Sequence, residues 1–158
     1  NTQKGFNQFL ETLTGGRITI AALALGISQG AYNLALNYSQ EREAFGKKIN
    51  KFQGVSFKLA DMATQIEATR HMVYNTAWLK DNNNSIIKEA AMAKLFSSEV
   101  AMKITTEAIQ IHGGYGYIRE YNVERFFRDA KILEIGEGTS EVQRIVISRE
   151  ILKSFNNQ

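Results

Sequence analysis

The sequence predicts an all-α protein, an up-and-down four-helix bundle with an additional short helix, and three observations lead to this prediction. The 158 residues include no proline, and because proline inside a helix costs about 3 kcal/mol, its absence permits very long helices. Apolar residues recur at helical spacing along extended segments. The connections between these segments are short, which makes a bundle the economical arrangement. With 44% hydrophobic residues, the chain suits one globular domain, residues 1–158.

We expect the first helix to extend from Phe6 to about Glu43, because apolar and small residues alternate there at helical spacing. A helix of about 30 residues would be roughly 45 Å long. Gly15 and Gly16 should interrupt it near its start, since each costs about 1 kcal/mol relative to alanine inside a helix. A polar loop follows at 44–50. The apolar positions of the helix are Ile18, Ala22, Leu25, Ile27, Tyr32, Leu36 and Tyr38.

The second helix should extend from about Phe52 to Lys80. Its apolar residues are separated by steps of three and four, with one longer step, as in the buried stripe of a helix bundle. The polar residues at 81–84 should end it as a solvated turn. The stripe consists of Phe52, Val55, Leu59, Met62, Ile66, Val73 and Ala77.

The third helix should begin after Ser85, which can cap its N-terminus, and continue to about Ile111. Gly113 and Gly114 should terminate it, as glycines following a helix commonly do. A shorter helix is expected around Val123 to Leu133. We expect the third helix to present one apolar face composed of Ile87, Ala91, Leu95, Met102 and Ile109.

The most informative stretch comes next, because Glu137 lies between Gly136 and Gly138 directly before another helix start. Ser140 and Gln143 fit the S-x-x-Q capping box, in which each side chain satisfies a backbone N–H of the first turn. A catalytic base could be presented by such a loop. Most glutamates in glycine-bounded loops are simply solvated, so this motif alone leaves both interpretations open.

Composition and charge exclude several classes of function. The net charge is +3, but the basic residues are scattered and form no run, so we expect no nucleic-acid partner. There is no cysteine, only two histidines and no Glu-x-x-His pair, so we expect no metal site. No uninterrupted apolar run reaches the ~18 residues of a membrane span, and we expect an intracellular protein. The missing initiator methionine suggests a fragment or a processed product.

Three further irregular segments lie at expected helix ends. They are Thr14-Gly15-Gly16-Arg17, Arg42-x-x-Phe45-Gly46 and Gln110-Ile111-His112-Gly113-Gly114. Each has an ordinary structural interpretation: an arginine at a helix C-terminus is favoured by the helix dipole, for example. These three segments and the Glu137 segment occur together and in order, which argues that the four are not independent.

In this order the motifs resemble the C-terminal helical domain of the acyl-CoA dehydrogenase family, of the short-chain or butyryl type, over nearly all of residues 5–153. The resemblance implies a protein with an N-terminal helical domain, a middle β domain and a C-terminal four-helix bundle, assembled as FAD-containing homotetramers. This sequence corresponds to the last of these parts. The matching segments are 16–18, 42–46, 52–53, 110–117, 128–131 and 137–141.

The resemblance implies α,β-dehydrogenation of acyl-CoA thioesters. A carboxylate removes a proton from the α carbon while the β carbon gives a hydride to flavin, and the base corresponds to Glu137. Because an ordinary glutamate titrates near ~4.3, the site must stabilise charge on the thioester oxygen, and one donor is worth about 2.7 to 4 kcal/mol. In the family one such donor is the backbone N–H of the base itself. Some branches place the base just before the arginine that matches Arg17, where this chain has Gly16, so Glu137 remains the candidate.

The resemblance also implies binding residues. Thr14, Arg17 and Gly138 correspond to substrate-binding positions, and Thr14 replaces the aspartate usual in the family. Contacts with FAD come partly from a neighbouring subunit. The cofactor-binding positions correspond to Arg42, Phe45, Gln53, Gln110, Ile111, His112, Gly113, Gly114, Thr139, Ser140 and Glu141.

Further expectations about partners follow from the family: an acyl-CoA substrate, self-association as a dimer of dimers, and electron-transfer flavoprotein as the acceptor. The location would be the bacterial cytoplasm or the mitochondrial matrix. Two alternatives stay open, a non-catalytic helical oligomerisation or interaction module and an acyl-CoA oxidase-like or nitroalkane-oxidising relative. A glutamate instead of an aspartate at position 137 argues against the nitroalkane branch.

Overall fold

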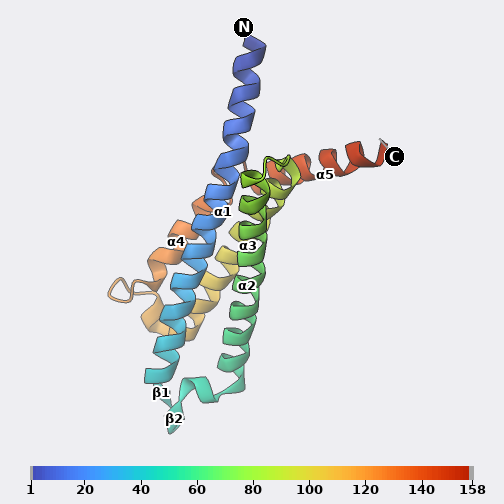
Figure 1. Ribbon diagram of the computed structural model, residues 1–158. Helices are drawn as coiled ribbons and strands as arrows, with labels where there is room; N and C mark the ends of the chain where they lie inside the picture. Colours follow the sequence, from blue (N-terminus) through green and yellow to red (C-terminus); the bar gives the residue numbers. More distant parts are fainter. Residues whose placement is uncertain (1, 157–158) are drawn as a thin grey trace.

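The computed structural model describes residues 2–156, and α-helices dominate this part of the chain (Figure 1). The predicted all-α class is confirmed. The predicted short helix, α4, has the expected bounds, whereas α1 is longer than expected. The helices are α1 (Thr2–Glu41), α2 (Gln53–Asp81), α3 (Ile87–His112), α4 (Val123–Leu133) and α5 (Ser140–Asn156).

Helices α1 to α4 alternate in direction and form an up-and-down bundle, and α3 is its central member. Helix α3 packs against α1, α2, α4 and α5, and α1 packs against α2, α3 and α4. The N-terminal turns of α1 extend beyond the other helices, and α5 leaves the bundle sideways (Figure 1). The loop between α4 and α5, which contains Glu137, therefore joins the bundle to its diverging last helix.

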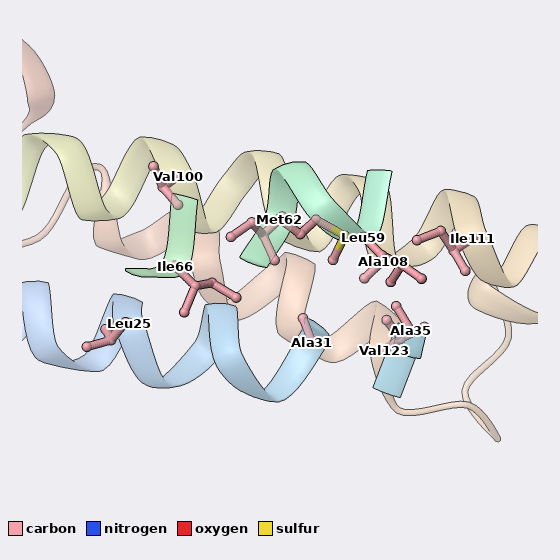
Figure 2. Close-up of a cluster of buried hydrophobic side chains, with 11 residues drawn as sticks. Leu25, Ala31, Ala35, Leu59, Met62, Ile66, Val100, Ala108, Ile111 and Val123 are labelled. Carbon is pink, nitrogen blue, oxygen red and sulfur yellow. The ribbon is translucent and has the colours of Figure 1, made fainter. Parts of the chain in front are cut away.

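The largest hydrophobic cluster combines side chains from α1, α2, α3 and α4 (Figure 2). Large residues of α2 face alanines of α1 and α3, and burying each large aliphatic side chain contributes about 1.5–3 kcal/mol. The alanines let the helix backbones approach closely. The cluster contains Leu25, Ala31, Ala35, Leu59, Met62, Ile66, Val100, Ile104, Ala108, Ile111 and Val123.

The apolar face expected for α3 is wrong in detail. Ile87 is 41% exposed, whereas Lys94, Ser97, Ser98 and Thr105 are buried. The reason is that α3 is surrounded by several helices, so small residues all around it are buried where neighbouring backbones come close. Serine and threonine hydroxyls on this helix donate to backbone carbonyls one turn earlier, as Thr105 does to Ala101, which satisfies them without any partner helix.

The expected interruption of the first helix at Gly15 and Gly16 is also wrong, because α1 is continuous from Thr2 to Glu41. A Cβ atom added at Gly16 would lie 2.7 Å from Oε2 of Glu137, and one at Gly15 would lie 3.2 Å from Nζ of Lys80. These two glycines mark places where other segments approach the helix, and they do not break it.

A small antiparallel hairpin occupies the segment that was expected to be a polar loop. Strands β1 (Glu43–Ala44) and β2 (Lys47–Lys48) are joined by Phe45 and Gly46, whose φ angles are 50° and 80°. Two consecutive positive φ angles are typical of a type I′ hairpin turn. Helix α1 ends before Glu43 because this residue pairs with Lys48 across the hairpin, also through an ion pair of 2.8 Å.

The helix-terminus predictions have mixed outcomes. Gly113 follows α3 with φ 60°, as expected for a helix stop. The expected cap at Ser85 is wrong, because α3 begins at Ile87, and Ile86 precedes it without a side-chain capping bond. Helix α3 is held by its packing in the bundle and does not depend on a side-chain cap.

Residues Thr12–Glu41 of α1 are long and apolar enough, with a mean hydropathy of 1.3, to cross a membrane by length and composition alone. The criterion applied to the sequence, an uninterrupted apolar run, missed this segment. The same segment packs against three helices of the bundle, which requires an apolar surface on several sides. In the described part of the chain 33% of its most apolar window is buried, so this packing accounts for part of its hydropathy.

Candidate functional site

Glu137 lies in the loop between α4 and α5 with a left-handed backbone conformation. Its φ is 54°, and Gly138 follows with φ 92°. Two buried side chains hold this loop: Gln143 Nε2 donates to the carbonyl oxygens of Glu137 at 3.1 Å and of Gly138 at 2.8 Å. Lys94 Nζ donates to the same Gly138 oxygen at 2.8 Å. The loop is therefore attached both to α3 and to the first turn of α5.

The exposed Glu137 side chain lies against Gly16 of α1, where a Cβ atom would collide with its carboxylate. The adjacent Arg17 is 7% exposed, and its Nε atom is buried with no hydrogen-bond partner among the described residues. Burial lowers the pKa of the Arg17 guanidinium, and the nearby Glu137 carboxylate opposes this change. The structure thus brings Glu137 close to Gly16 and Arg17, which lie far from it in the sequence.

The start of α5 differs from the expected capping box. The Oγ atom of Ser140 is buried without a hydrogen-bond partner in the described part of the chain, and Gln143 is engaged with the Glu137 loop. Instead, Thr139 Oγ1 accepts a hydrogen bond from the Val142 N–H at 3.4 Å, so Thr139 is the capping residue. The exposed Glu141 carboxyl has a pKa below its usual value because its own backbone N–H and the Thr139 hydroxyl donate to it.

A cavity of about 440 Å³ lies at the other end of the bundle, beside the C-terminal ends of α1 and α3. Arg42, Ile111, His112, Gly113 and Gly114, all expected cofactor residues, line it together. Tyr115, which belongs to the matching segment 110–117, lines the same cavity. The sequence interpretation missed Tyr38, Ile49 and Ile118, which also line it, although Tyr38 precedes Arg42 by one helical turn.

Aromatic contacts order this cavity. The His112 ring stacks on Tyr38 with centroids 4.3 Å apart, and its Nδ1 atom lies 2.8 Å from the Ala108 carbonyl oxygen. Burial lowers the pKa of His112, so the neutral imidazole is favoured. The Arg42 guanidinium carbon lies 5.5 Å from the centroid of the Tyr115 ring, within the range of a cation–π contact. A planar cation is thereby placed at the cavity wall.

Three other expected cofactor residues lie near this end of the bundle but do not line the cavity. Phe45 is at the hairpin tip, 96% exposed, with its ring edge-on to Phe52 at 6.2 Å. Gln53 is the exposed first residue of α2, and Gln110 is exposed in the last turn of α3. These side chains face outward, where a second molecule could meet them.

The expected substrate residues Thr14 and Arg17 line a different cavity, of about 650 Å³, between α1, the α2–α3 turn and α5. Two cations that the sequence interpretation missed, Lys80 and Arg149, also line it, with Glu150 as the single acidic residue. A smaller cavity of about 360 Å³ is lined in part by Thr139, Ser140 and Glu141. Both cavities adjoin the part of the bundle that holds Glu137.

The two groups of expected site residues are far apart on one chain. Gly16, which contacts Glu137, lies on the continuous helix α1, and Arg42 directly follows the last residue of this helix, Glu41; the 26 positions between Gly16 and Arg42 correspond to about 39 Å at ~1.5 Å per residue. A single pocket of one chain therefore does not contain both groups.

Comparisons with known proteins are consistent with one another. A family model described as "Acyl-CoA dehydrogenase, C-terminal domain" matches residues 3–152. A probable acyl-CoA dehydrogenase, YngJ of Bacillus subtilis, is 61% identical over 150 residues, covering 95% of this chain and 40% of that protein. The mitochondrial short-chain specific acyl-CoA dehydrogenase of Sus scrofa is 54% identical over 154 residues, covering 97% of this chain and 37% of that protein.

Among solved structures, butyryl-CoA dehydrogenase from Megasphaera elsdenii superimposes with a TM-score of 0.93 at 53% identity, over 94% of this chain and 39% of that one. A chain from a structure of the electron transferring flavoprotein of Acidaminococcus fermentans matches with a TM-score of 0.92 at 55% identity, over 93% of this chain and 39% of that one. The chain thus spans about two fifths of the length of the relatives it matches.

Proposed function

The chain belongs to the acyl-CoA dehydrogenase family, whose C-terminal helical domain it matches, and from this premise we propose that it contributes the catalytic base, Glu137, of an FAD-dependent acyl-CoA dehydrogenase. The main support is the placement of Glu137. Its loop is fixed by two buried side chains, and its exposed carboxylate lies across a glycine of α1.

In this proposal one carboxylate oxygen of Glu137 takes the proton from the α carbon of the acyl thioester. FAD, when bound, supplies the hydride acceptor for the β carbon. Among residues 2–156, the amide N–H of Glu137 donates to no backbone carbonyl. This N–H is therefore available to the thioester oxygen as charge develops there, and one donor of this kind is worth about 2.7 to 4 kcal/mol.

The cavity of about 650 Å³, which Arg17 lines, has the charge that a CoA thioester requires. Arg17, Lys80 and Arg149 line it, and CoA carries phosphate groups that guanidinium and ammonium groups bind. Thr14 supplies a hydroxyl where the family usually has a carboxylate, so this side of the cavity has one negative charge fewer. We propose that the substrate's polar end enters here, beside Thr14 and Arg17.

The residues expected to bind FAD are suited to such a ligand. Arg42 offers a planar guanidinium at a cavity wall, and side chains added at Gly113 or Gly114 would meet no atom within 4 Å, so their backbones are open to a ligand. The buried Ser140 Oγ, which has no hydrogen-bond partner among the described residues, and the N-terminus of α5 form a second polar surface beside the Glu137 loop. Their separation of about 39 Å from Arg42 means that one chain cannot supply both surfaces to one FAD.

We therefore propose a homo-oligomer, a dimer of dimers, in which each FAD is bound between neighbouring chains. One similar relative is named caffeyl-CoA reductase-Etf complex subunit CarC of Acetobacterium woodii, 50% identical over 150 residues, covering 95% of this chain and 40% of that protein. On that basis electron-transfer flavoprotein is the proposed electron acceptor. The proposed location is the bacterial cytoplasm or the mitochondrial matrix.

Replacing Glu137 by glutamine tests the proposed function. We expect Glu137→Gln in the full-length, FAD-loaded protein to abolish the loss of flavin absorbance on adding a short acyl-CoA, because the amide cannot accept the α proton. FAD content should be unchanged. Glu67→Gln is the matched control, since Glu67 lies on α2 in an ion pair with Arg70, away from the Glu137 loop. Normal flavin bleaching by Glu137→Gln would refute the assignment and favour a non-catalytic interaction module.

A further inference from the structure

Lys94, in the N-terminal half of α3, is fully buried, with an exposed fraction of 0%. Lysine is almost never buried to this extent unless its ammonium has partners. Its Nζ atom donates to the Gly138 carbonyl oxygen at 2.8 Å. Burial lowers the pKa of Lys94, while the nearby carboxylates of Glu134, Glu141 and Glu137 oppose this change and Arg17 adds to it.

The hydrogen bonds of Lys94 and Gln143 determine how the loop is oriented. Because the peptide unit is planar and trans, fixing a carbonyl in one direction fixes the following N–H in the opposite direction. Gln143 fixes the peptide unit after Glu137, and Lys94 and Gln143 together fix the one after Gly138. The positive φ of Glu137 is disfavoured for a residue with a side chain, so it persists only where surrounding bonds hold it.

We propose that Lys94 is a positioning residue for Glu137, and that its ammonium, through the Gly138 carbonyl, holds the loop so that the Glu137 carboxylate lies across Gly16. This inference rests on the proposed role of Glu137. A purely structural role explains Lys94 poorly, because a buried charge is costly and an apolar side chain of similar shape commonly stabilises a protein at least as well. A charged donor is stronger than a neutral one and can hold a strained loop.

The first test replaces Lys94 by methionine, which has a similar length but no charge, in the full-length, FAD-loaded protein. We expect kcat to fall about 10- to 100-fold, as misplacement of a reacting group by about 1 Å does. KM should change less than threefold and FAD content should be unchanged, since Lys94 lines neither the cavity of about 650 Å³ nor the cavity of about 440 Å³. Lys103→Met is the control, because Lys103 is an exposed lysine on the same helix.

A second measurement follows the loop independently of activity. The Ser140 N–H donates to the Glu134 carbonyl at 3.0 Å and so closes the Glu137 loop. Its hydrogen-exchange rate, measured by mass spectrometry on the full-length protein, reports how often the loop opens. We expect exchange at Ser140 to be at least tenfold faster in Lys94→Met than in wild type or Lys103→Met.

The outcomes separate this inference from the proposed function. A loss of kcat with faster exchange supports the inference, and if Lys94→Met does not fold, Lys94→Gln is judged by the same two readouts. Wild-type kcat, or reduced kcat with unchanged exchange, overturns it. If Glu137→Gln is fully active, the proposed function fails, and unchanged exchange at Ser140 would then show separately that Lys94 does not hold the loop.

Discussion

At the scale of single residues, Glu137 adopts a conformation that its own side chain disfavours, with φ 54°. Such a conformation costs of order 1–3 kcal/mol and persists where the surroundings determine it. The sequence identified Glu137 because it lies between two glycines before a helix. It could not show that the carboxylate lies against Gly16 or that Lys94 holds the loop, because both contacts arise from the packing of α1 and α3 against this segment.

Gly16 provides a prediction at this scale. A Cβ atom there would lie 2.7 Å from the Glu137 carboxylate, so Gly16→Ala should displace the carboxylate and reduce kcat at least tenfold. The free energy of unfolding should stay the same or rise by up to about 1 kcal/mol, since alanine is the better helix former.

The matched control is Gly26→Ala on the same helix, where an added Cβ atom meets nothing within 4 Å. This variant should gain a similar amount of stability, about 0.5–1 kcal/mol, without losing activity. Turnover and urea unfolding of the two variants check both statements. Equal kcat for Gly16→Ala and wild type would show that this contact does not position the base.

At the scale of elements, helical spacing predicted where the helices lie, but local motifs predicted their details poorly. The capping box at Ser140 and Gln143, the cap at Ser85 and the interruption at Gly15 and Gly16 are wrong. In two of these cases a long-range contact decides the outcome: Gln143 binds the Glu137 loop, and Gly16 lies under the Glu137 side chain. Such contacts are invisible to a motif of four residues.

The capping of α5 gives a second prediction. Thr139→Ala should lower the free energy of unfolding by about 1 kcal/mol, because the Val142 N–H loses its acceptor. Ser140→Ala should be neutral or slightly stabilising, since the buried Ser140 hydroxyl has no partner among the described residues. Chemical denaturation of both variants measures the difference. A larger loss of unfolding free energy for Ser140→Ala than for Thr139→Ala would support the capping box expected from the sequence.

At the scale of the whole molecule, the distance between the two groups of site residues is the main finding. Arg42 and the segment 111–114 gather at one end of the bundle, and Glu137 lies near the other, about 39 Å away at ~1.5 Å per residue of α1. The sequence motifs identified the residues of both groups. They could not show that the groups lie at opposite ends of the bundle, because a motif gives no distance between residues that are far apart in the sequence. The helix length and its continuity establish the separation.

We expect the isolated 158-residue chain to fold and self-associate but to bind little FAD. It corresponds to one of the three domains that the family resemblance implies, and the other two would complete the proposed FAD pocket. Large side chains on the outer face of α2, Phe57, Tyr74 and Trp78, are more than 60% exposed and support self-association. Light scattering should give a mass that is a multiple of 17.8 kDa. Stoichiometric FAD absorbance in a monomeric chain would contradict the proposal of a site shared between chains.

The central claim is that the Glu137 carboxylate takes the α proton, and α-carbon exchange with solvent deuterium tests it most directly. The probe is an acyl-CoA analogue with sulfur at the β position, which has no β hydride to give and so isolates the proton transfer. We predict that the full-length, FAD-loaded wild-type protein incorporates deuterium at the α carbon and that Glu137→Gln, with the same FAD content, does not. Exchange by Glu137→Gln at the wild-type rate would show that another group is the base.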